Sequence, residues 1–186
     1  MLIRDAQRDV RSVFRGGFAG QLVSGTLWLL SAALATWGTP RRAILLLVIG
    51  GFFIFPLTQL LLRAMRRPAA LPPGHPFNAL AMQVAFTLPL GLPLVGAAAL
   101  HRLDWFYPAF MILLGAHYLP FVFLYGMWQF AALSGVLVAG GLVLGLYVPA
   151  PFATGGWLTG AALVAFAFVG RAAARTDAPA APAAKA

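Results

Sequence analysis

The chain has 186 residues, of which 61% are hydrophobic and 9% are charged. Soluble domains carry roughly 25% charged and 45–50% apolar residues, so this composition excludes an ordinary soluble globular domain. The net charge is +9 and cysteine is absent, which excludes disulfide bonds, thiolate metal sites and cysteine nucleophiles. The basic residues flank apolar segments and form no nucleic-acid-binding motif, so they indicate a lipid bilayer and no nucleic-acid partner.

Residues 1–17 have the pattern of an amphipathic helix that lies on the membrane surface. One face carries Leu2, Ile3, Ala6, Val10, Val13 and Phe14, and the other carries Arg4, Asp5, Arg8, Asp9, Arg11 and Arg15. A basic amphipathic segment of this kind prefers the membrane interface. The alternative is a flexible basic leader.

Six apolar segments of about twenty residues follow, and each is long enough to cross the hydrocarbon core as a helix. We expect the spans at 18–38, 43–62, 77–99, 105–124, 128–147 and 152–170. The predicted fold class is therefore all-α, a polytopic bundle of six transmembrane helices in one domain over 18–170. The Ala- and Pro-rich segment 171–186 is predicted to be a disordered cytoplasmic tail.

The basic residues predict how the chain is oriented. Ten of them fall on the side that also holds both termini: Arg4, Arg8, Arg11, Arg15, Arg63, Arg66, Arg67, Arg171, Arg175 and Lys185. Three fall on the other side: Arg41, Arg42 and Arg102. Because cytoplasmic loops carry the excess of Lys and Arg, both termini are predicted to be cytoplasmic, in a multi-pass protein of the bacterial inner membrane.

Glycine and proline mark positions where helices pack closely or bend. Pro89 and Pro93 each remove a backbone donor from the third span, which should kink or break in its outer half. Gly141 and Gly145 are four residues apart, a spacing that lets two helix backbones approach in lipid. This pair is a candidate homodimer face, and packing within one bundle is the alternative.

Polar residues within the spans gather in the predicted cytoplasmic half. Such groups are costly in hydrocarbon unless they are paired or hydrated, so we expect them to face one another. His117 is the ionisable group deepest in a span and is a functional candidate for that reason. The candidate ligand-binding residues are His117, Tyr118, Tyr125, Gln129, Asn78, Gln83, Gln59 and Arg63. A seam of interhelical hydrogen bonds without a ligand is the alternative.

One segment carries a resemblance to a known group of proteins. The segment Gly-Ala-His-Tyr-Leu-Pro-Phe-Val-Phe-Leu-Tyr-Gly-Met at 115–127, with His-Pro-Phe-Asn at 75–78, resembles short, uncharacterised bacterial polytopic membrane proteins. That group implies a shared site around His117, Tyr118 and Asn78 but no catalytic role. His75 itself precedes a proline in a turn, where we expect it to be solvated.

These features leave two functional hypotheses. One is a small-solute transporter or small-molecule-binding bundle with a cytoplasm-facing polar pocket. The other is a non-catalytic membrane subunit that binds a protein partner, a lipid or a pigment, with His117 available as an axial ligand. The spans hold no carboxylate pair, metal-binding cluster or Ser–His–Asp set, so the sequence favours neither an enzyme nor a particular cofactor.

Overall fold

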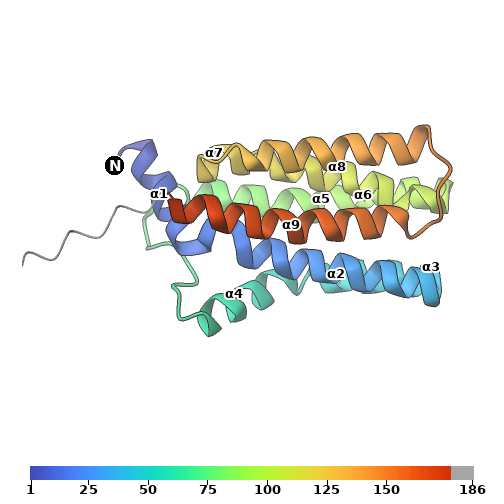
Figure 1. The fold of residues 1–186 in the computed structure, drawn as a ribbon, viewed down its shortest axis with the longest axis horizontal. Coiled ribbons are helices and arrows are strands. Elements are labelled where there is room, and N and C mark those ends of the chain that lie inside the picture. Colours follow the sequence, from blue (N-terminus) through green and yellow to red (C-terminus); the bar gives the residue numbers. More distant parts are fainter. Residues whose placement is uncertain (177–186) are drawn as a thin grey trace, which may run out of the picture.

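The computed structural model describes residues 1–176, which form helices and connecting turns without any strand (Figure 1). The helices are α1 (Ile3–Phe14), η1 (Arg15–Gly17), α2 (Phe18–Trp37), α3 (Pro40–Gly51), α4 (Ile54–Ala64), α5 (Asn78–His101), η2 (Leu103–Trp105), α6 (Phe106–Tyr118), α7 (Phe121–Tyr125), α8 (Gln129–Leu146) and α9 (Thr154–Thr176). The start of α1 and the end of α9 lie at the same end of the bundle, here called the terminal end (Figure 1). The opposite end is the far end. Within the predicted tail, 171–176 continue α9, and 177–186 lie outside the described residues.

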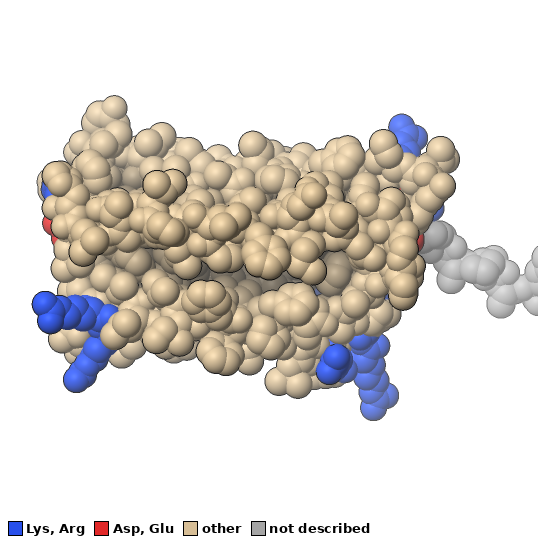
Figure 2. All heavy atoms as spheres, turned by 180° about the vertical axis from the view of Figure 1, so that it is seen from behind, with Lys and Arg blue, Asp and Glu red and all other residues tan. Residues whose placement is uncertain are grey.

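The bundle has the surface of an integral membrane protein. Five helices are long and apolar enough to cross a membrane, and the bent pair α3 and α4 would make a sixth span. Figure 2 shows the Lys and Arg side chains at the two ends of the molecule, with an uncharged face between them. Large apolar side chains such as Leu45, Phe55 and Leu90 are exposed on the outside of the helices. The predicted all-α membrane bundle is therefore confirmed in outline.

The predicted span 43–62 is not one helix. It divides into α3 and α4, which meet at an angle of 61°. Pro56 has no backbone N–H to donate to the carbonyl of Phe52, so the helical ladder cannot pass through this point undisturbed. Phe52 and Phe53 instead donate to Ile49 and Gly50 in a tighter turn.

The third span behaves in the opposite way. α5 runs from Asn78 to His101 as one helix through both Pro89 and Pro93, so the helix does not break there, and the predicted kink stays a prediction. Both prolines are exposed, and Pro89 lines the space between α5 and the helices α2, α4 and α6. The carbonyl of Ala85 nevertheless lacks a helical donor, because Pro89 has no backbone N–H.

Glycines set the closest contacts between helices. A Cβ on Gly160 of α9 would lie 2.9 Å from the backbone nitrogen of Leu29 in α2, so the two backbones touch here. A Cβ on Gly141 of α8 would lie 2.7 Å from the carbonyl oxygen of Pro108 in α6. The face of Gly141 and Gly145 is thus occupied within the chain, and a homodimer through these residues stays a prediction.

α1 packs across the terminal end of the bundle, against α7. Ala6 and Val10 are buried in this contact. Gln7 donates through Nε2 to the carbonyl of Phe123 at 2.7 Å, and Arg11 donates through Nη1 to the carbonyl of Tyr125 at 2.6 Å. Two carbonyls that the short helix α7 leaves without helical donors are satisfied in this way.

Candidate functional site

A cavity of about 510 Å³ occupies the half of the bundle nearer the terminal end. Its walls come from α2, α4, α5, α6 and α7, and Figure 2 shows the molecule hollowed along the middle of one face. The lining is mainly apolar, and two of its phenylalanines, Phe55 on α4 and Phe86 on α5, are largely exposed. The cavity therefore opens sideways, toward the lipid-facing surface. Six polar side chains line it: Gln21, Ser24, Thr58, His117, Tyr118 and Tyr125.

His117 enters the cavity with a defined hydrogen-bond role. Thr87 donates its single hydroxyl proton to the carbonyl of Val84 at 2.7 Å. The Thr87 oxygen lies 2.9 Å from Nδ1 of His117, and a hydroxyl whose proton goes to Val84 accepts at that contact, which predicts the Nδ1–H tautomer. Nε2 then keeps its lone pair, and it has no partner among the described residues. The imidazole thus offers one free acceptor.

The two tyrosines are fixed by their rings and free at their hydroxyls. Tyr125 stacks on Phe121 with centroids 5.7 Å apart and contacts Phe130 at 4.8 Å. Tyr118 contacts Phe121 and Phe130 at 5.4 and 6.1 Å. These contacts orient both rings, yet neither hydroxyl has a hydrogen bond to another described residue. Each hydroxyl can donate to or accept from a group in the cavity.

Buried oxygens in the wall also lack partners. Oε1 of Gln21 and Oγ1 of Thr58 are inaccessible and have no hydrogen bond within the described chain. Leaving such a group unpaired in a water-free region costs roughly 1–3 kcal/mol. Neither oxygen is accessible, and Gln21 Oε1 lies 3.8 Å from the place of a Cβ on Gly170, so the polar groups that the cavity presents to a ligand are those of His117, Tyr118 and Tyr125.

Three of the eight candidate residues predicted from sequence meet at this cavity: His117, Tyr118 and Tyr125. The other five do not line it. Asn78 donates from Nδ2 to the carbonyl of Pro72. Gln83 and Arg63 are exposed, and Gln59 and Gln129 are half-buried. Gln21, Ser24 and Thr58 take their place. The signal that could have found them is their predicted depth, because all three belong to the predicted cytoplasmic halves of their spans, as His117 does.

His75 is buried and not solvated, which corrects the expectation from its turn. Its Nδ1 accepts from the backbone N–H of Phe77 at 3.2 Å, and its Nε2 lies 3.8 Å from the Asp9 carboxylate of α1. The turn after α4 therefore packs under the leader helix. This contact joins segments far apart in the sequence, so local pattern could not predict it.

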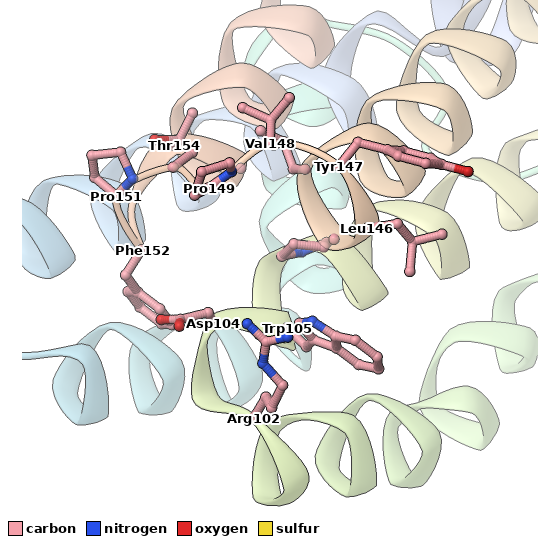
Figure 3. A pocket seen from close by; sticks show the side chains of 15 residues that line it. Arg102, Asp104, Trp105, Leu146, Tyr147, Val148, Pro149, Pro151, Phe152 and Thr154 are labelled. Carbon is pink, nitrogen blue, oxygen red and sulfur yellow. The ribbon is translucent and has the colours of Figure 1, made fainter.

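A second cavity of about 510 Å³ lies at the far end (Figure 3). Arg102 and Trp105 form one wall, with the guanidinium 5.5 Å from the indole centroid, and the connection between α8 and α9 forms the other. This connection contains Pro149 and Pro151. The polar side chains here are at the surface between connecting segments, so the buried cavity in the terminal half is the better candidate site.

The described residues contain no group of three or more His, Cys, Asp or Glu side chains that could hold a metal ion. No curated protein and no solved structure matches the chain. One family model does match, over residues 3–172, which covers the helices from α1 to α8, most of α9 and the whole of the cavity wall. By that match the chain belongs to a family of unknown function, DUF7010.

Proposed function

We propose that this protein binds an amphipathic small molecule, taken from the bilayer, in the cavity of the terminal half. The observation that carries the proposal is the unpaired set in its wall: the His117 Nε2 nitrogen and the Tyr118 and Tyr125 hydroxyls. Ligand pockets combine a volume of about 300–1,000 Å³ and apolar walls with a few polar groups, as here.

The shape of the cavity favours an elongated, largely apolar ligand. Its walls between Phe55 and Phe86 are apolar and open toward lipid, which gives a hydrocarbon chain an entry path that avoids water. A hydroxyl or carbonyl at the inner end of the ligand would meet both donors and acceptors. The cavity lining contains neither a carboxylate nor a Lys or Arg side chain, which favours a ligand that is neutral where it contacts His117.

The proposed setting is a bacterial inner membrane. The broken pair of α3 and α4 counts as one span, which gives six spans with both termini cytoplasmic. The charge distribution supports this orientation, since Arg15, Arg67 and Arg175 belong to the terminal end and Arg41 and Arg102 to the far end. The cavity then faces the cytoplasmic half.

Transport is a second candidate, and the break at Phe52 favours it. Gly51 and Phe52 line the cavity at the point where α3 turns into α4. Broken helices at membrane depth recur at the binding sites of transporters, where they move as gates. A scaffold that binds a protein partner or a pigment has no comparable observation in its favour.

The test is to fill the cavity and compare a matched variant on the same helix. Ala85 lines the cavity on α5, while Ala97 is exposed on α5 away from it. Native mass spectrometry of protein extracted gently from its own membrane should show a bound small molecule of defined mass. We expect Ala85→Trp to lose this molecule and Ala97→Trp to retain it.

The bound mass in the two tryptophan variants distinguishes a ligand site from an empty gap between helices. The proposal would be contradicted if the wild-type protein carried only loosely held phospholipid and the two variants carried the same amount. His117→Ala gives an independent check, because loss of one charge-neutral hydrogen bond should weaken binding by roughly five- to tenfold without closing the cavity.

A further inference from the structure

Four arginines gather at the terminal end from three separate parts of the chain. Arg15 belongs to η1, Arg67 follows α4, and Arg171 and Arg175 lie in the last turns of α9. Burial, and then the positive charges of Arg67, Arg171 and Arg175, lower the pKa of Arg15, which places all four within electrostatic range. Arg15 precedes the first span and lies at the end of the bundle.

The backbone holds two of these like charges together. Gly16 and Gly170 meet so closely that a Cβ on Gly16 would overlap the Gly170 carbonyl, and a Cβ on Gly170 would lie 2.6 Å from the Gly16 oxygen. Arg15 and Arg171 are the residues beside these glycines. Arg15 also takes a left-handed conformation with φ 51°, which is unfavourable for a residue with a side chain. The fold thus stabilises an arrangement that charge repulsion opposes.

No carboxylate within residues 1–176 neutralises the cluster. Asp5 lies 3.7 Å from Arg8, Asp9 lies beside His75, and Asp104 is at the far end. The Nε atoms of Arg15 and Arg171 are inaccessible and have no hydrogen-bond partner in the described chain. The Arg171 guanidinium lies 4.7 Å from the ring centroid of Phe18, which fixes it in place without neutralising it.

We propose that Arg15, Arg67, Arg171 and Arg175 bind a phosphate-bearing anion. The planar guanidinium binds phosphate oxygens in pairs, and a phosphate monoester or diphosphate carries enough negative charge to offset several arginines at once. The cluster is at the depth where spans end, so the anion is either the headgroup of an acidic phospholipid or a soluble phosphate compound. This site is separate from the cavity and does not depend on its ligand.

The experiment uses the whole protein in neutral phosphatidylcholine nanodiscs at physiological salt. Phosphatidic acid added to the nanodisc probes a lipid headgroup, with native mass spectrometry counting the retained lipid. Pyrophosphate in solution probes a free phosphate, with calorimetry measuring binding. The test variant is Arg15→Gln with Arg171→Gln. The control, Arg4→Gln with Arg63→Gln, removes the same charge from exposed positions outside the cluster.

We expect the cluster variant to bind the preferred probe at least about tenfold more weakly, because each arginine near a membrane contributes on the order of fivefold. The control should change binding by less than about threefold, since Arg4 and Arg63 are not among the charges that act on Arg15 and salt screens charges outside the cluster. Binding of phosphatidic acid with no binding of pyrophosphate assigns a lipid headgroup, and the reverse assigns a soluble phosphate compound.

Two results would overturn the proposal: an equal loss in the control, or no binding of either probe to the wild type. If Arg15→Gln with Arg171→Gln does not fold, Arg67→Gln with Arg175→Gln replaces it. Both of these side chains are exposed, so they can be changed without disturbing the glycine contact. The same weakening is expected, and its absence would contradict the site.

Discussion

The two halves of the bundle treat their polar side chains differently. In the far half, the Ser31 hydroxyl donates to the Ala43 carbonyl at 2.9 Å. The Tyr107 hydroxyl, 2.6 Å from Ser31, must then be the donor in their shared bond. The indole of Trp157 likewise donates to Thr36 at 3.1 Å. These bonds join α2 to α3, α6 and α9.

In the terminal half the corresponding groups face a cavity instead of one another. The Tyr118 and Tyr125 hydroxyls make no hydrogen bond within residues 1–176, and both residues line the same cavity as His117. The far half has unpaired buried atoms as well, Thr159 Oγ1 and Trp105 Nε1, but they do not line one cavity together. Polar residues in a membrane bundle therefore mark a site when several converge unpaired on one space, and they act as packing contacts when they pair.

The largest effect on stability should come from the contact between α2 and α9, which runs through both halves of the bundle. Gly160→Ala puts a methyl group 2.9 Å from the Leu29 backbone nitrogen, which cannot move without separating α9 from α2. We expect a loss of roughly 2–3 kcal/mol in unfolding free energy, because overpacking against backbone has few ways to relax. Reversible unfolding in mixed micelles measures it.

Gly135→Ala on α8 is the matched control, since a Cβ there meets nothing within 4 Å. It should leave stability unchanged or raise it by up to about 1 kcal/mol, because alanine favours the helix. Equal effects in the two variants would mean that the α2–α9 contact does not hold the bundle together.

The comparison of halves is tested directly by two serines on α2. Ser31→Ala removes the partner of both the Ala43 carbonyl and the Tyr107 hydroxyl, which are buried, and should cost roughly 1–2 kcal/mol. Ser24→Ala removes a cavity-lining hydroxyl that has no partner in the described residues and should cost less than about 0.5 kcal/mol.

The same unfolding measurement compares both variants with the wild type. Because each serine is replaced by the same residue on the same helix, intrinsic helix propensity cancels between them. If Ser24→Ala destabilised the protein as much as Ser31→Ala, the hydroxyl of Ser24 would have a structural partner, and the contrast between the halves would fail.

Sequence could predict the depth of a residue in this protein but not the direction in which it faces. Hydropathy places Gln83 and Thr58 in the same half of the membrane, yet Gln83 is exposed on α5 while Thr58 lines the cavity. A helix surrounded by lipid and protein needs no polar face, so nothing in its pattern reports its rotation. His117, Tyr118 and Tyr125 were predictable together because one short segment carries all three.

The break between α3 and α4 shows a second reason why sequence could not predict the whole site. Pro56, Pro89 and Pro93 all remove a backbone donor, but the helix divides near Pro56 and runs through the other two. A lost hydrogen bond allows a helix to bend, and the surrounding helices determine whether it does. The cavity opens between α4, which follows the break, and α5, which is continuous. Its existence therefore depends on contacts between helices, which no local sequence pattern contains.

The smallest effect concerns a polar pair of the terminal half that does form, Thr87 and His117. If Thr87 accepts from Nδ1, then selective ¹⁵N labelling should show His117 as the Nδ1–H tautomer with an unprotonated Nε2. Thr87→Val should reduce stability by no more than roughly 0.6–1 kcal/mol, the usual value of an interhelical hydrogen bond in a membrane. Thr26→Val, which removes a bond to its own helix at Leu22, should cost less. A protonated Nε2 in the wild type would mean that the imidazole presents a donor to the cavity, and the ligand would then need an acceptor at that point.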